Sequence, residues 1–475
     1  MHLPLIKYCR GVQILQQSNI KEYIKIVCEQ IRWKKAHDVI SEEIESHITD
    51  QKNAFIKGGL DNKTATEKAI MEMGDPILIG TEFDRTYRPK IERSIIVLTC
   101  ILVLTGLSVR YFVIYNAPIT FEFSVFNDLL SIIIGFICML MAYFIDFSII
   151  GKHPKKIFFG LTVLSLLLNF MDNRINTSAK FLILPISSSF ILLLFPTAFA
   201  GIIYAMRQKS YFGIIQAGLI FSISAVICLN TWNISNIVIY GISCLILLTM
   251  SILSGWFNVK RSNALFLIYG AVALISSILI LIIITTRSYI LFRIQSAFNP
   301  SLNPQTSGWL IIFVRNIISG AKFFGQGTLG EYAGVSLPSI HSDFLLTYLI
   351  HKLGWISFIV IMTIIIIFIV RLFILCKKQK SVLAKLVSTS ILITFTMQVV
   401  VYVFYNLGFQ LLSPLSLPFI SYGGTSNVIN MSLIGLMLSV FNTGEFYRDD
   451  ISKNSLDKKL FEYADGKISI NLNAK

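Results

Sequence analysis

Residues 355–376 read WISFIVIMTIIIIFIVRLFILC and contain a single charged side chain, Arg371. They end an apolar run of residues 343–376, which exceeds the roughly 20 residues that a helix needs to cross a bilayer. Soluble domains carry about a quarter of charged residues, whereas this chain of 475 residues carries 14% and has a mean hydropathy of +0.70. The sequence therefore predicts an integral membrane protein.

Apolar runs recur through the rest of the chain and define a membrane domain of residues 91–445. Because each run is about as long as a bilayer is thick, the fold class we expect is all-α, a polytopic membrane protein with about ten transmembrane helices. The runs lie at residues 94–114, 125–150, 157–171, 187–206, 212–230, 234–256, 264–286, 343–376, 381–406 and 424–442.

The first 90 residues have a different composition and predict a small soluble helical domain. Thirteen of the 26 acidic residues of the chain precede residue 91. Asp61 or Asn62 can cap a helix that runs through Met73, and Gly74–Pro76 can end that helix and begin another. Apolar residues recur before it at helical spacing, at Ile40, Ile44, Ile48 and Phe55.

Basic residues predict the orientation of the runs. No apolar signal-peptide core precedes the helical domain, so we expect a cytoplasmic N-terminus, and an even number of spans then makes the tail of residues 446–475 cytoplasmic as well. Eleven basic residues fall in the connections predicted to be cytoplasmic, against three in the short outer ones, as the positive-inside rule requires. The eleven are Lys152, Lys155, Lys156, Arg207, Lys209, Lys260, Arg261, Arg371, Lys377, Lys378 and Lys380; the three are Arg110, Arg174 and Lys180.

Cysteine spacing and net charge exclude other classes of protein. The seven cysteines show no paired spacing that would suggest a disulfide framework or a zinc site. The net charge of +15 is explained by basic residues at helix ends, so nucleic acid is not an expected partner.

Two long connections are predicted on the outer side, residues 287–342 and 407–423, and the chain has few carboxylates to place there. Between Asp172 and Glu445 the only acidic residues are Glu331 and Asp343. The same loop carries His341 and four cations, which suit an anionic substrate such as a lipid-linked phosphate. These cations are Arg287, Arg293, Arg315 and Lys322. The alternatives are that the arginines extend to the membrane interface and that Asp343 caps the eighth helix.

Several motifs in this half of the chain resemble one family. LPFISYGGTS, residues 417–426, resembles the C-terminal signature of the SEDS family of FtsW, RodA and SpoVE. RIQSAFNP, residues 293–300, resembles that family's Arg-x-x-x-Phe-Leu-Asp-Pro, and LPSIHSDF, residues 337–344, resembles Leu-Pro-Glu-x-His-Thr-Asp-Phe. Gly325–Gly327 and Asn406–Gly408 also resemble family motifs. The first 90 residues resemble helical cytoplasmic domains of some Gram-positive regulatory proteins.

The resemblance implies a ten-helix peptidoglycan glycosyltransferase that polymerises lipid II at the outer face of the bacterial cytoplasmic membrane, in division, elongation or sporulation. It implies that Asp343 is the essential acid, acting as a general base or as a ligand of a divalent cation, Mg²⁺ or Mn²⁺. The implied partners are undecaprenyl-diphosphate-linked glycan and a class B penicillin-binding protein. The substrate-binding candidates are Arg293, His341, Glu331, Ser421, Tyr422, Gly423 and Gly424.

The chain also departs from the family pattern. Ser339 replaces the usual Glu before His341, Phe313 stands where Gln is frequent, and His351-Lys352 stands where acidic residues are usual. These departures leave open a polymerase with a divergent site and one with a different lipid-linked acceptor. The main alternative to an enzyme is a non-catalytic scaffold that recruits a transpeptidase. A flippase for the lipid-linked precursor is the lesser alternative. Transport usually needs ionisable groups along the membrane path, and the predicted spans between Asp172 and Glu445 contain no carboxylate in mid-membrane.

The charge asymmetry predicts which loops an impermeant thiol reagent reaches. A cysteine introduced at Gln305 should label on intact protoplasts because its loop is predicted to be outside, and one introduced at Gln208 should not. Labelling at Gln208 with none at Gln305 would reverse the topology.

Overall fold

The computed structural model describes residues 20–86, 92–116, 125–175, 188–228, 234–286, 288–306, 308–329, 335, 337–444, 461–464 and 467–470. Contacts divide the chain into two units, Ile91–Glu445 on the one hand and Met1–Lys90 with Phe446–Lys475 on the other. We call the described part of the first the membrane unit and residues 20–86 the N-terminal unit. Both are helical, which confirms the predicted fold class.

Four helices and one short 3-10 turn form the N-terminal unit: α2 (Ile20–Gln30), η1 (Lys34–Ala36), α3 (His37–Lys57), α4 (Asn62–Met73) and α5 (Pro76–Thr86). The apolar positions predicted from helical spacing belong to its core. Ile40, Ile44 and Ile48 lie on one face of α3 and are at most 1% exposed, and Phe55 packs beside them.

The helix boundaries of this unit follow from local chemistry. Asp61 is the N-cap of α4, and its carboxylate accepts the Lys63 amide, as the sequence predicts. Gly74, with φ of +85°, ends α4, and the Asp75 carboxylate accepts the Ile77 amide at the start of α5. A left-handed backbone favours glycine at that helix end.

The membrane unit contains the spans predicted from hydropathy. Among the described residues, nine helical segments are long and apolar enough to cross a membrane, so the chain is a multi-pass membrane protein. They are α6 (Arg93–Asn116), α7 (Val125–Phe144), Pro154–Met171 of α9 (Pro154–Ile175), Ser188–Met206 in α10 (Ser188–Ile191), η2 (Leu192–Leu194) and α11 (Phe195–Met206), α13 (Ile234–Leu253), Arg261–Ile278 of α14 (Arg261–Thr286), α18 (Trp355–Lys378), α19 (Val382–Asn406) and α20 (Gly424–Thr443).

The other predicted run, residues 212–230, corresponds to α12 (Tyr211–Cys228), whose apolar part Tyr211–Ala225 is shorter than the nine. Shorter helices complete the unit: α8 (Ser148–Lys152), α15 (Ser288–Phe298), η4 (Pro300–Leu302), α16 (Trp309–Ser319) and α17 (Leu345–Leu353).

The predicted eighth run, residues 343–376, is wrong as a single helix. It is divided into α17 and α18 at Gly354, whose φ is +89°. A Cβ at Gly354 would lie 2.5 Å from the Phe323 carbonyl oxygen, so the break is also a close approach of the preceding loop. Asp343 therefore precedes a short separate helix, and the span itself begins at Trp355.

Glycines allow α7 and α20 to approach each other closely. A Cβ at Gly435 of α20 would lie 2.8 Å from the Met139 carbonyl carbon of α7, and one at Gly135 would collide with the Met431 sulfur. Small residues at such positions let helix backbones approach closely in a membrane.

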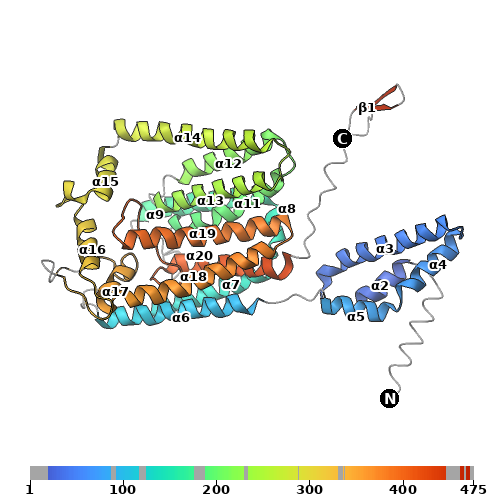
Figure 1. The fold of residues 1–475 in the computed structure, drawn as a ribbon, viewed down its shortest axis with the longest axis horizontal. Helices are drawn as coiled ribbons and strands as arrows, with labels where there is room; N and C mark the ends of the chain where they lie inside the picture. Colours follow the sequence, from blue (N-terminus) through green and yellow to red (C-terminus); the bar gives the residue numbers. More distant parts are fainter. Residues whose placement is uncertain are drawn as a thin grey trace, which may run out of the picture. The chain divides into compact units, whose positions relative to one another are not determined.

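Figure 1 shows how the spans are layered: α19 and α20 lie in the middle, α6, α7 and α18 on one side, and α11 and α13 on the other. At the start of α6, Glu92 and Ser94 bind Arg371 of α18, with 3.4 Å between the Glu92 Oε2 and Arg371 Nη2 atoms. α14 lies at the edge of the bundle and packs on α13 and α15.

In the predicted tail of residues 446–475, the described part is a two-stranded antiparallel hairpin of β1 (Phe461–Ala464) and β2 (Lys467–Ile470), with Phe461 opposite Ile470. This hairpin is the one exception to helical structure among the described residues that form regular elements.

Buried isoleucines of α3 should dominate the stability of the N-terminal unit. In a fragment of residues 1–88, Ile44→Ala should lower the free energy of unfolding by about 2–5 kcal/mol, because it leaves a cavity in the core. Ile56→Ala on the same helix is the matched control, since Ile56 is 41% exposed. Urea unfolding followed by circular dichroism measures both, and a wild-type fragment without helical signal would contradict an independently folded unit.

Candidate functional site

Asp343 lies in a tight turn held by its own backbone. Ser339 adopts a left-handed conformation, with φ of +47°, and its carbonyl oxygen accepts the amides of Ser342, Asp343 and Phe344 at 3.0–3.3 Å. A left-handed backbone is uncommon for a residue other than glycine and persists where the surroundings enforce it. The turn therefore fixes the direction from which the Asp343 side chain leaves the backbone.

Helix α19 holds the same turn from the other side. The Tyr402 hydroxyl donates to the Ser342 carbonyl oxygen, and the Asn406 Nδ2 donates to the Asp343 carbonyl oxygen, both at 2.8 Å. The Asn406 Oδ1 in turn accepts the Thr347 amide at 3.1 Å, at the start of α17. All these bonds engage main-chain atoms of the turn, so they leave the Asp343 carboxyl group to other partners.

The environment of the two ionisable side chains favours their neutral forms. Burial raises the pKa of the Asp343 carboxyl, and a hydrogen bond from the Ser342 side chain partly opposes that rise. Burial lowers the pKa of His341. A carboxylate whose pKa is raised is a stronger proton acceptor than an ordinary one, which suits a general base.

A second turn, residues 417–423, lies against the first. The Tyr422 amide donates to the His341 carbonyl oxygen at 2.8 Å. The Ser421 hydroxyl oxygen accepts the Leu417 amide at 2.7 Å, and Phe419 has a φ of +66°. Gly423 and Gly424 then begin α20. The structure thus brings His341 and Asp343 together with the Ser421–Gly424 segment, and burial raises the pKa of Tyr422.

Arginines bind the backbone of the connection 407–423. The Arg293 Nη2 donates to the Leu412 carbonyl oxygen at 3.4 Å, and Arg315 donates to the carbonyl oxygens of Gly408 and Ala297 at 3.2 Å. Tyr405 lies within electrostatic range of both Asp343 and Arg293. A guanidinium has five N–H donors, so Arg293 can still bind an anion.

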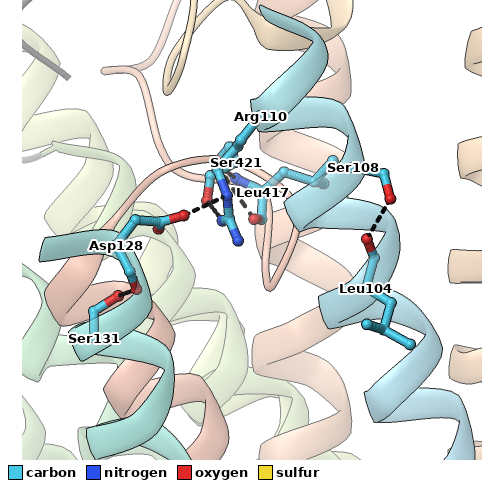
Figure 2. Close-up of polar contacts among 7 residues, drawn as sticks. All are labelled: Leu104, Ser108, Arg110, Asp128, Ser131, Leu417 and Ser421. Carbon is cyan, nitrogen blue, oxygen red and sulfur yellow. Dashed lines mark hydrogen bonds and ion pairs between the residues drawn. The ribbon is translucent and has the colours of Figure 1, made fainter. Parts of the chain in front are cut away.

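One ion pair at this end of the unit was not found from the sequence. Arg110 of α6 and Asp128 of α7 are 2% and 3% exposed, and their Nε and Oδ2 atoms lie 3.0 Å apart. The Arg110 Nη1 also donates to the Ser421 carbonyl oxygen at 3.0 Å, as Figure 2 shows. The assignment of Arg110 to a short outer connection is therefore wrong, because it lies inside α6 and is buried. The assignment of Arg371 to an inner connection is wrong as well, because it lies inside α18.

Two further expectations concern the carboxylates of the predicted loop. The N-cap of α17 is Phe344, without a side-chain capping bond, so Asp343 does not cap that helix. Glu331 lies outside the described residues.

The ligand atoms available at Asp343 suit a divalent cation that is bound jointly by the protein and by a substrate. Among the described residues, no group of three or more His, Cys, Asp or Glu side chains could bind a metal ion alone. Mg²⁺ is commonly bound through one or two carboxylates together with substrate phosphate oxygens and water. A single carboxylate at Asp343 fits that mode and does not fit a site made of protein ligands only.

Comparison with known sequences gives relatives of one kind. A sequence model of the cell cycle protein family of FtsW, RodA and SpoVE matches residues 91–444. Trichlorobacter lovleyi has a probable peptidoglycan glycosyltransferase FtsW that is 30% identical over 159 residues, 33% of this chain and 42% of that protein. The FtsW of Buchnera aphidicola from Schizaphis graminum is 26% identical over 237 residues, 49% of this chain and 64% of its own. The chain thus spans about half the length of these curated relatives.

Solved structures share the fold of the membrane unit. A chain from a peptidoglycan synthase complex, described as coordinating polymerization and crosslinking, has a TM-score of 0.56 at 15% identity, over 74% of this chain and 97% of its own. Thermus thermophilus rod shape determining protein RodA has a TM-score of 0.50 at 14% identity over the same shares. Since the family model covers nearly all of the membrane unit, the chain belongs to the FtsW, RodA and SpoVE family of cell cycle proteins.

Proposed function

We propose that this protein is a peptidoglycan glycosyltransferase that polymerises lipid II. The observation that carries the proposal is the fixed position of Asp343, whose turn is held by Ser339, Tyr402 and Asn406 beside the segment Ser421–Gly424. Family membership and FtsW-named relatives support the same activity.

The reaction joins two lipid-linked sugars. The 4-hydroxyl of one lipid II attacks the anomeric carbon of the growing strand, a new C–O bond forms, and the bond to undecaprenyl diphosphate breaks with its electron pair going to the diphosphate. The hydroxyl proton passes to the Asp343 carboxylate. The raised pKa of Asp343 suits that step, because the carboxylate then holds the proton more firmly.

Other residues bind and orient the substrate in this proposal. Arg293 contacts the diphosphate, since planar guanidinium donors stabilise the charge that grows on the leaving group. His341, Ser421 and Tyr422 with the following glycines shape the wall of the site. Glu331 is a weaker candidate for substrate binding. In the alternative to its role as general base, Asp343 would hold a divalent cation, Mg²⁺ or Mn²⁺, which would neutralise charge on the diphosphate.

The proposal includes the side of the membrane on which the site lies and the protein partner. Asp343 and residues 417–423 face the outside of the cytoplasmic membrane, with both termini in the cytoplasm, because the basic residues mark the opposite connections. The partner we propose is a class B penicillin-binding protein, which would crosslink the strands. The structural neighbour from a peptidoglycan synthase complex supports a partner of that kind.

Purified protein tests the function directly. Labelled lipid II should be converted to glycan strands by the chain, alone or with its cognate transpeptidase, and the products are separated by electrophoresis. Recruitment of the transpeptidase without polymerisation would identify a scaffold instead, and movement of lipid II across vesicles without polymerisation would identify a flippase.

Removing the carboxylate should abolish that activity while leaving the fold. Asp343→Asn should lower polymerisation by about 100 to 10,000-fold, the usual contribution of a general base. The hydrogen bonds that hold the turn are made by its main-chain atoms, so the variant should keep the melting temperature of the wild type. Glu331→Gln is the control and should have a much smaller effect. Equal polymerisation by Asp343→Asn and the wild type would refute the role of Asp343.

The pH dependence should report the same carboxyl group. Activity requires the ionised form, so it should fall as the pH drops through the pKa of Asp343, at a pH above that of an ordinary aspartate. Ser342→Ala removes a hydrogen bond that lowers this pKa and should move the acidic limb to higher pH. A limb that stays in place in rate profiles of kcat/KM would show that another group titrates.

A further inference from the structure

Two residues on one face of α6 contact the turn 417–423. A Cβ at Gly106 would collide with the Phe419 carbonyl oxygen and lie 2.8 Å from the Ile420 Cα. Arg110, one helical turn further along, donates to the Ser421 carbonyl oxygen at 3.0 Å. Gly106 leaves room for the turn, and Arg110 supplies a charged hydrogen-bond donor to it. Helix α6 therefore contacts the turn 417–423 directly.

Asp128 fixes the guanidinium in that position. Its Oδ2 lies 3.0 Å from the Arg110 Nε, and both side chains are almost fully buried between α6, α7 and the turn. Figure 2 shows the carboxylate on one side of the guanidinium and the Ser421 carbonyl on another. Tyr422 lies within electrostatic range of both charges. A charged pair in a span is costly to bury, and such pairs in membrane proteins commonly serve a function.

The contact continues to Asp343 through the backbone. Ser421 is followed by Tyr422, whose amide donates to the His341 carbonyl oxygen, two residues before Asp343. The Ser421 hydroxyl oxygen meanwhile holds the Leu417 amide, which closes the turn. Main-chain bonds thus connect the buried pair with the turn that carries the reactive carboxylate.

From these contacts, we propose that Arg110 and Asp128 are positioning residues, which hold the Ser421 carbonyl and so set the place of the Asp343 turn relative to the rest of the site. The inference rests on the proposed glycosyltransferase function for its effect on catalysis. Its effect on the turn itself can be measured without any activity.

An apolar replacement of both partners separates positioning from folding. Replacing a buried ion pair by apolar residues of similar size often leaves stability unchanged, whereas removing one partner leaves a buried charge. The double variant Arg110→Met with Asp128→Leu should therefore insert and melt like the wild type. It should lose about tenfold in kcat for lipid II, with KM changed less than about twofold, because the hydrogen bond to Ser421 is lost.

Hydrogen exchange of the Tyr422 amide measures how firmly the turn 417–423 is held against the Asp343 turn. Exchange of the Tyr422 amide should become about tenfold faster in the double variant while the amides of α6 and α7 stay protected. The matched control is Arg371→Met with Glu92→Leu, which removes the pair at the opposite end of α6. That variant should leave both kcat and Tyr422 exchange at wild-type values.

Each result decides the proposal. Wild-type kcat together with wild-type exchange in the folded double variant would overturn it. If the double variant does not fold, Arg110→Lys decides, since lysine keeps the charge beside Asp128 but lacks the fork that binds two acceptors. We expect faster Tyr422 exchange in Arg110→Lys, and unchanged exchange overturns the proposal. Faster exchange in a protein whose wild type does not polymerise lipid II would sustain the positioning role and reject the proposed function.

Discussion

Buried backbone that is not helical needs partners for its amide and carbonyl groups, and the site of this chain depends on that constraint. The two turns of the site, residues 339–344 and 417–423, lie between helices and lack a continuous helical hydrogen-bond pattern. Arg110, Arg293 and Arg315 each donate to a carbonyl oxygen of the segment 408–421, and Asn406 does so for Asp343. Cations that a sequence presents as ligands for phosphate are thus also the donors that hold the irregular backbone in one shape.

These two uses are compatible because a guanidinium has more donors than one carbonyl requires. Arg293 binds Leu412 with a single long bond and is the best suited of the three to meet an anion. Arg110 is buried and has its carboxylate partner at 3.0 Å, so it is suited to a fixed position. Asp343 differs from both arginines. Its main-chain carbonyl accepts a hydrogen bond from Asn406, and burial raises the pKa of its carboxyl group.

Hydropathy alone predicted most of the spans, because length and apolar composition decide whether a helix can cross a bilayer. It failed at Gly354, because a long apolar run was taken as one span although His351, Lys352 and a left-handed glycine interrupt it. The Asp61 cap was predictable because its partner is two residues away. Motif resemblance indicated Asp343 and the Ser421–Gly424 segment. The pair of Arg110 and Asp128 was not predictable, since its partners lie on different spans and only packing brings them together.

The contacts of α6 and α7 with the end of the chain affect how the protein folds during its synthesis. Arg110 and Asp128 lie on consecutive spans, so they can neutralise each other as soon as both helices have entered the membrane. The Ser421 carbonyl lies 311 residues beyond Arg110. Helix α20, whose Met431 packs against Gly135 of α7, is the last of the described spans. At about 5–20 residues per second, roughly 15–60 s of synthesis separate these events. The early hairpin must therefore remain stable and unaggregated while it waits for the end of its own chain.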